Sequence, residues 1–228
     1  MQKYAIISLV VGLLLNSYYQ GGMVMVITIA RQFGSGGREI GRTLAKKLGI
    51  GFYDKQLITL AAKESGIDPE IAKNLDEKAS NSLLYSLSLG AAATFDGGFQ
   101  IAPQLPLNDR LFLVQHDIIK KLSSEPCVIV GRCGDYVLKD RTDCVKLFIY
   151  ADMDKRIRYA VDVHKVSKEK APSIITKTDK TRANYYNYYS TGKWGDPNNY
   201  NLCINSGELG VTRCVELIEF YLRQRGMI

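Results

Sequence analysis

The sequence predicts an α/β fold in which a parallel β-sheet is flanked by helices, and three observations support this prediction. Short, continuous apolar runs at residues 24–30, 127–130 and 144–151 have the composition of strands buried on both faces. Patterns with helical spacing follow the first and the last of these runs. A glycine-rich turn at residues 34–37 joins the first run directly to a helical pattern. Strands that alternate with helices in this way form parallel sheets.

The turn after the first strand is the first candidate site, because it has the strand–glycine loop–helix arrangement that binds phosphate. Glycines let the backbone approach an anion, and unpaired N–H groups at the helix start point toward it. The P-loop pattern G-x-x-x-x-G-K-[ST] is not met in any register. With its second glycine at Gly36, Gly37 stands in the place of the lysine and Arg31 in that of the first glycine; a shift by one puts Arg38 in the lysine position. An ordinary glycine-containing turn is the alternative.

The remaining elements follow in order along the chain. Gly49 has the position of a helix C-cap, and Pro172 is expected to break a helical pattern. A loop as long as residues 80–107 is usually functional, often a lid, or else disordered. The further predicted elements are an extended segment at 51–54, helices at 55–65 and 68–79, a helix at 110–122 capped by Asn108 and Asp109, helices at 152–167 and 179–190, a strand at 201–205 and a last helix at 211–225.

Composition indicates a globular protein with an anionic partner. Hydrophobic residues make up 46% of the 228 residues and charged residues 23%, which leaves room for a real core. The net charge of +7 is matched by residues 155–193 alone, where ten Lys and Arg stand against three Asp and Glu. A nucleotide, a nucleic acid or a membrane surface would suit this charge, although basic helical faces are often simply solvated.

The five cysteines and two histidines do not form a recognisable metal site. No C-x-x-C pair occurs and the cysteine number is odd, so free thiols in a reducing cytosol are expected. His116 and His164 lie far apart in helical patterns, and we expect structural or surface roles for both. We therefore expect a cytoplasmic protein.

Residues 1–24 differ from the rest of the chain. The apolar run at residues 4–15 is too short for an ordinary membrane-spanning helix and lacks a signal-peptide cleavage site after it. Met23 and Met25 directly precede the first strand, so we expect the working protein to begin near Met25. A membrane-anchored or exported form is the alternative.

Charged residues follow several of the predicted strands, where parallel α/β sheets bind ligands. Arg132 comes just after the strand at 127–130, and Asp152 after the strand at 144–151. Asp54 ends the second strand region and could orient an acceptor phosphate, hold a metal through water, or cap the next helix. We expect a charged residue such as Arg132 at this edge of the sheet to bind a ligand rather than to pack in the core.

The segment at residues 155–193 supplies further cations: Arg156, Arg158, Lys180 and Arg182. Helix residues two apart point in different directions, so only some of the four can reach one ligand. Phosphoryl transfer needs such groups, since catalysis there is mostly positioning and cationic stabilisation of oxygens.

Four stretches resemble the bacterial cytidylate kinase-like family: ITIARQFGSGGREIGRTLAKKLGIGFYDKQLI, VIVGRCGDYVL, VKLFIYAD and DKTRANYYNYYSTGKWGDPNNYNLCINS. They occur in the family's order and cover most of residues 25–215. The resemblance implies a P-loop nucleoside monophosphate kinase-like fold over residues 25–228, with an NMP-side insert at about 55–107 and a basic lid at about 155–193. It implies transfer of phosphate from ATP, with Mg²⁺, to CMP or dCMP.

The family's functional residues can be placed on this sequence. By resemblance, Gly34, Ser35, Gly36, Gly37 and Arg38 hold the phosphates of ATP. Asp54, Lys55 and Arg132 face the monophosphate, and Arg156, Asp179, Lys180 and Arg182 belong to the lid. Arg38, Arg132, Lys180 and Arg182 are the expected catalytic residues. The sequence departs from authentic cytidylate kinases at Cys133, where they have Asp, at Lys180, where they have Arg, and at Asn205-Ser206, which is altered. It also lacks the Tyr-Arg that they have after the position of Lys55, and it lacks the P-loop lysine.

The expected function is therefore an ATP-dependent nucleoside monophosphate kinase, with Arg38 as the candidate replacement for the lysine. A nucleotide-binding regulatory protein on the same scaffold, and a kinase for another phosphate acceptor, are the alternatives. Nucleic-acid binding ranks low, because the paired tyrosines at residues 185–189 suit packing or a lid better than base stacking. No membrane partner is expected unless residues 1–24 act as an anchor. The sequence does not determine the oligomeric state.

Overall fold

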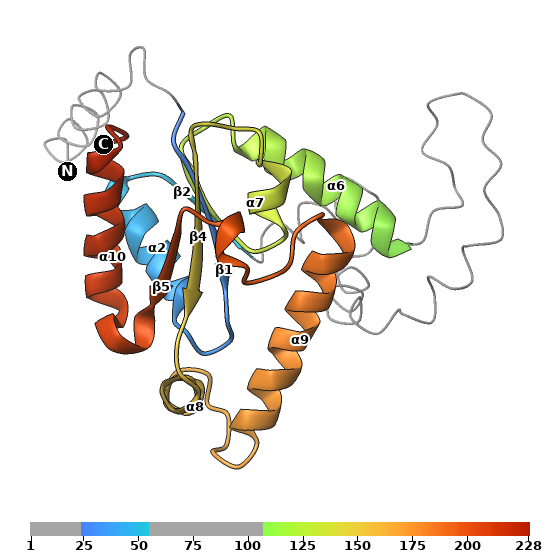
Figure 1. Ribbon diagram of the computed structural model, residues 1–228, viewed down its shortest axis with the longest axis vertical. Helices are drawn as coiled ribbons and strands as arrows, with labels where there is room; N and C mark the ends of the chain where they lie inside the picture. Colours follow the sequence, from blue (N-terminus) through green and yellow to red (C-terminus); the bar gives the residue numbers. More distant parts are fainter. Residues whose placement is uncertain (1–23, 55–106) are drawn as a thin grey trace, which may run out of the picture.

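The structure is a computed structural model that describes residues 24–54 and 107–228 (Figure 1). The elements in chain order are β1 (Val26–Arg31), α2 (Gly37–Leu48), β2 (Gly51–Tyr53), α6 (Leu107–Leu122), β3 (Cys127–Val130), α7 (Gly134–Val137), β4 (Cys144–Tyr150), α8 (Met153–Asp162), α9 (Ala171–Tyr189), the 3₁₀ helix η2 (Pro197–Asn199), β5 (Leu202–Asn205) and α10 (Ser206–Gln224). The N-terminal segment 1–23 and most of the predicted insert, residues 55–106, lie outside the described residues. Within the described ranges, no helix combines the length and the apolar character needed to cross a membrane.

The predicted parallel sheet is confirmed. Its five strands lie in the order β2-β3-β1-β4-β5, and every pairing is parallel. Central β1 pairs with β3 and β4 from its first residue, Val26, which lies opposite Cys127 on one side and Cys144 on the other. Because all the strands run the same way, their carboxyl ends share one edge, and the loops that follow β1, β3 and β4 meet there.

Helices cover both faces of the sheet, as Figure 1 shows, so the continuous apolar strands are buried from both sides. On one face, Ile27 and Ile29 of β1 pack in a cluster with α2 and α10. On the other face, Val26 and Ile129 pack with α6 and α7. All five cysteines are free thiols, and every one except Cys203 is buried, as small hydrophobes are.

The prediction that Pro172 breaks a helix is wrong. Helix α9 begins at Ala171, so Pro172 lies in its first turn. Proline is tolerated there because the first N–H groups of a helix have no partner within it. Asn108 and Asp109 likewise lie inside the first turn of α6 rather than before it. The other boundaries differ from the predictions by a few residues, chiefly at the end of α8 and the start of α10.

Candidate functional site

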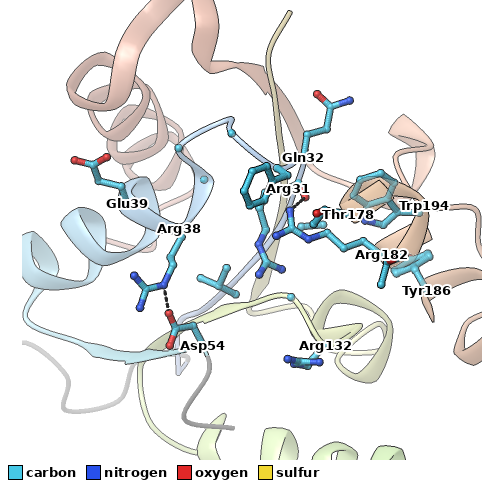
Figure 2. A pocket seen from close by; sticks show the side chains of 18 of the residues that line it. Arg31, Gln32, Arg38, Glu39, Asp54, Arg132, Thr178, Arg182, Tyr186 and Trp194 are labelled. Carbon is cyan, nitrogen blue, oxygen red and sulfur yellow. Dashed lines mark hydrogen bonds and ion pairs between the residues drawn. The ribbon is translucent and has the colours of Figure 1, made fainter. Parts of the chain in front are cut away.

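A cleft of about 870 Å³ lies at the carboxyl ends of β1 and β3 (Figure 2). Its walls come from the β1–α2 loop, the start of α2, the residue after β2, the β3–α7 loop, the end of α8, one side of α9 and Trp194. The charged side chains in this lining are five arginines and three carboxylates: Arg31, Arg38, Arg42, Arg132, Arg182, Glu39, Asp54 and Asp135. The described part of the cleft is therefore net positive, which suits an anionic ligand.

The glycine loop predicted to bind phosphate forms one wall of this cleft. Gly34 and Gly36 have φ angles of 78° and 70°, which residues with a Cβ rarely adopt. Gly36 is the N-cap of α2, so the first N–H groups of the helix are presented at the cleft. Ser35 is buried, and its carbonyl oxygen accepts a 2.6 Å hydrogen bond from Ser206 Oγ. The loop therefore has a fixed shape that leaves backbone donors at the wall of the cleft, as in helix N-termini that bind anions.

Two residues assigned to the lid, Arg156 and Asp179, form an ion pair with each other. Asp179 also accepts a 2.7 Å hydrogen bond from the Phe33 backbone N–H. Arg156 is buried, and a Cβ on Gly34 would lie 2.6 Å from the Arg156 carbonyl oxygen. Neither side chain is part of the described cleft lining. The pair therefore supports the glycine loop from outside the cleft and links the loop to α8 and α9.

Arg38 enters the cleft as one half of an ion pair. Its Nε donates to Asp54 Oδ2, and the two side chains are 48% and 8% exposed. Asp54 follows β2 as the sequence suggested, and both residues line the cleft. Lys55, expected beside them, lies outside the described residues. The carboxylate of Asp54 therefore balances the charge of Arg38 within the cleft.

Arg132 lies in the cleft at the end of β3, as expected from its place in the sequence. Its φ of 60°, and that of Cys133 at 53°, are unusual for residues other than glycine. Burial lowers the pKa of Arg132. Asp152, expected in the same region, follows β4 but is not part of the described lining. A strained backbone that directs an arginine into a pocket is typical of a functional position.

The two remaining cations of the predicted lid, Lys180 and Arg182, differ in position: Arg182 faces the cleft and Lys180 faces solvent. Arg182 lines the cleft, and its Nη1 donates a 3.0 Å hydrogen bond to the Arg31 carbonyl oxygen. Burial, followed by the charge of Arg132, lowers the pKa of Arg182 to about 10. Lys180 is exposed and is not part of the described lining. The expectation that residues two apart on this helix diverge is met, and the role of Lys180 stays a prediction.

Arg31 is a cleft residue that was not predicted to belong to the site. It ends β1, and in Figure 2 its guanidinium points into the space between Arg132 and the Arg38–Asp54 pair. Burial lowers its pKa well below the usual value, and the charges of Arg182 and Arg132 add to the effect. The signal was present in the sequence, because Arg31 replaces the first glycine of the P-loop pattern.

Metal ligation by protein groups alone is not evident in the described residues, where no cluster of three His, Cys, Asp or Glu side chains could hold an ion. Mg²⁺ in kinases is usually held by one or two carboxylates together with substrate phosphates and water. Asp54 provides one carboxylate at the cleft. The donor set therefore fits an ion that arrives with a nucleotide.

Comparison with known proteins identifies the family. The model of the cytidylate kinase-like family matches residues 26–208. An uncharacterized protein from Eubacterium ventriosum has a crystal structure similar to this chain, with 25% identity and a TM-score of 0.63 over 87% of this chain and 98% of that one. A shikimate kinase from Acinetobacter baumannii in complex with shikimate is 11% identical, with a TM-score of 0.49 over 94% of this chain and 99% of that one. A search of curated proteins gave no significant match. The family match spans the glycine loop and all the cleft arginines, and the chain belongs to the cytidylate kinase-like family.

Proposed function

We propose that the protein transfers the γ-phosphoryl group of ATP to a nucleoside monophosphate, with CMP or dCMP as the expected acceptor. The observation that carries the proposal is the convergence of arginines from separate elements beside a glycine loop: Arg31, Arg38, Arg132 and Arg182. Family membership supports phosphoryl transfer as the reaction. The pyrimidine acceptor is inferred from the family alone.

The chemistry requires cations more than it requires a base. An acceptor phosphate, with a second pKa of about 6, is largely ionised at neutral pH, so its oxygen can attack without giving up a proton. That oxygen bonds to the γ-phosphorus while the bond to the β–γ bridging oxygen breaks, and ADP leaves. The glycine loop and Arg38 are assigned to ATP, Arg132 to the acceptor phosphate, and Arg182 to the group in transfer, with Lys180 as the further predicted cation. Mg²⁺, when bound, neutralises charge on the β- and γ-phosphates, and Asp54 would reach it through water.

A nucleotide-binding protein without turnover is the second candidate. It is favoured by Gly37 in place of the P-loop lysine and by Arg38 in place of the Ser or Thr that normally holds Mg²⁺. Binding of ATP without ADP release in the presence of any acceptor would select this reading.

An ADP-release assay with ATP and a panel of CMP, dCMP, UMP and AMP tests the leading proposal. Turnover with CMP or dCMP is expected, and Arg132→Ala should raise the KM for the acceptor by about tenfold or more, since an ionic hydrogen bond contributes about 1.5–3 kcal/mol. Arg158→Ala is the matched control, because Arg158 is an exposed arginine paired with Asp154 away from the cleft lining. Absence of turnover with all four acceptors would reject the proposal.

A further inference from the structure

Two departures from the P-loop pattern concern residues that touch in space. Counted from the second glycine at Gly36, the lysine position holds Gly37 and the first glycine position holds Arg31. In sequence these look like two separate losses. In the structure, Gly37 begins α2 and Arg31 ends β1, on either side of the same loop.

The side chain of Arg31 occupies the space that a side chain at position 37 would need. A Cβ on Gly37 would lie 2.7 Å from Cβ of Arg31 and 3.2 Å from its Cγ. Real Cβ atoms do not approach so closely, so glycine at 37 is a condition for arginine at 31. The two departures from the P-loop pattern are therefore coupled: the cation stands at the end of β1 instead of at the start of α2.

The guanidinium of Arg31 then reaches the centre of the cleft. It lies against the backbone of Gly131, where any Cβ would collide with Arg31 Nη1. Gly131 has a φ of 83°, so its lack of a side chain serves both the turn and this contact. Within residues 24–54 and 107–228, no acceptor is found for a hydrogen bond from the Arg31 guanidinium, while Asp54 is paired with Arg38.

The charges around Arg31 point to an anionic ligand. Burial lowers the pKa of Arg31 most, the like charges of Arg182 and Arg132 lower it further, and the carboxylate of Asp54 only partly opposes them. Three guanidinium groups brought together in one cleft, partly shielded from water, repel one another and lose hydration. A polyphosphate would relieve both costs, because arginine binds phosphate oxygens through paired, charge-assisted hydrogen bonds.

We propose that Arg31 takes the place of the missing P-loop lysine and binds the β- and γ-phosphates of a nucleoside triphosphate. For the transfer step this inference rests on the proposed function, whereas phosphate binding does not depend on it. Arg38 is the other candidate for the role. It follows Gly37 on α2, is about half exposed and is paired with Asp54, so its charge is already balanced.

The test measures nucleotide binding by calorimetry, separately from turnover. Arg31→Ala should weaken ATP and ADP binding by about 10- to 100-fold, the loss expected for hydrogen bonds to a charged group. Binding of AMP should change much less. Arg31→Lys should retain part of the affinity, and Arg158→Ala, at the exposed ion pair, should retain all of it. Circular dichroism and melting temperature show whether each variant is folded.

Moving the cation from position 31 to position 37 gives a second readout, which an arginine with a purely structural role would not produce. Gly37→Lys alone should lower the melting temperature, because the new stem collides with Arg31. The double variant Arg31→Gly with Gly37→Lys restores the first glycine and the lysine of the P-loop pattern, with Arg38 still in the position of its Ser or Thr. It should bind ATP at least tenfold more tightly than Arg31→Gly alone.

The possible outcomes distinguish a failure of this inference from a failure of the proposed function. Wild-type binding of ATP without turnover on any acceptor rejects the kinase proposal and leaves the Arg31 result decisive. A folded Arg31→Ala that binds ATP as the wild type does overturns the inference, and a loss confined to Arg38→Ala would assign the role to Arg38. Failure of the wild type to bind ATP or ADP at millimolar concentration also overturns it.

Discussion

Gly34 is the residue of the loop whose replacement the structure constrains most. Its φ is 78°, and a Cβ would lie 2.6 Å from the Arg156 carbonyl oxygen, a backbone atom that cannot move aside alone. Gly34→Ala should therefore combine the cost of a left-handed conformation, about 1–2 kcal/mol, with an overpacking cost of about 1–3 kcal/mol. Urea unfolding measures the sum, and ATP affinity should fall with it.

Gly49 provides the matched control for this substitution. It also has a positive φ, 68°, but nothing lies within 4 Å of where its Cβ would be. Gly49→Ala should show the conformational cost alone and leave ATP affinity unchanged. Equal losses of stability at Gly34 and Gly49 would mean that the contact with Arg156 has no energetic consequence.

Individual cleft residues could be predicted from the sequence where a motif marked them or where position along a strand determined them. Arg132 and Asp54 directly follow strands, so the parallel sheet alone places them at the ligand edge. Arg31 also directly follows the predicted run at 24–30, but the replacement for the lysine was sought at Arg38, because the contact between Arg31 and Gly37 across the loop is visible only in the structure. The sequence signal for Arg31 is that an arginine stands at the first-glycine position of the P-loop pattern while a glycine stands at its lysine position.

At the scale of elements, the Arg156–Asp179 pair joins α8 to α9 and supports the loop at Phe33. The two side chains are 9% and 14% exposed. Asp179→Asn keeps an oxygen that can accept from Phe33 N–H but leaves the charge of Arg156 buried without its partner. Breaking a buried pair in this way costs about 3–5 kcal/mol, which chemical denaturation should detect.

A second ion pair on α8 serves as the control. Arg158 and Asp154 lie four residues apart with both side chains 64% exposed. Asp154→Asn should leave the unfolding free energy almost unchanged, since exposed pairs contribute little. If Asp154→Asn and Asp179→Asn destabilise equally, burial of the Arg156–Asp179 pair does not matter and its support of the glycine loop is rejected.

Asp135 links α7 to α9 through a 2.8 Å hydrogen bond from Tyr186, and it predicts a pH dependence. Burial raises the pKa of Asp135, although the Tyr186 bond acts in the opposite direction. A carboxyl with a raised pKa holds its proton more tightly in the folded state. Its contribution to the unfolding free energy therefore falls as pH rises from the unfolded pKa, near 3.8, through the folded value.

Asp135→Asn isolates that contribution, because the amide oxygen can still accept from Tyr186 and does not ionise. The unfolding free energy of Asp135→Asn minus that of the wild type should increase between pH 4 and pH 7. Thermal or urea unfolding across this range measures it. A difference that stays constant with pH would show that Asp135 does not bind its proton more tightly when folded.

The elements themselves were largely predictable, and their exceptions have local causes. Buried strands were evident because continuous apolar runs have few other uses in a chain of this length. The start of α9 was missed because proline was read as a breaker, although Pro172 lies in the first turn, where it is tolerated. Predicted elements within residues 55–106 fall outside the described residues and stay predictions.

At the scale of the whole molecule, the sequence predicted a parallel sheet but not the order of its strands. β1 and β3 are neighbours although about a hundred residues of chain separate them. Pairing at such separation depends on which apolar faces fit together, and a list of strands does not contain that information. The cleft is a product of this order, since it places the ends of β1 and β3, and hence Arg31 and Arg132, side by side.

This arrangement predicts that phosphates, rather than the base, account for most of the stabilisation by a nucleotide. A ligand that binds only the folded protein stabilises it by about 2.7 kcal/mol at 100 times its Kd. For a protein of this size, this corresponds to a rise in melting temperature of roughly 5–10 °C. ATP should produce such a shift, whereas adenosine at the same concentration should produce almost none. A comparable shift with adenosine would show that base and ribose contacts dominate, and the cluster of arginines would then have to serve another anion.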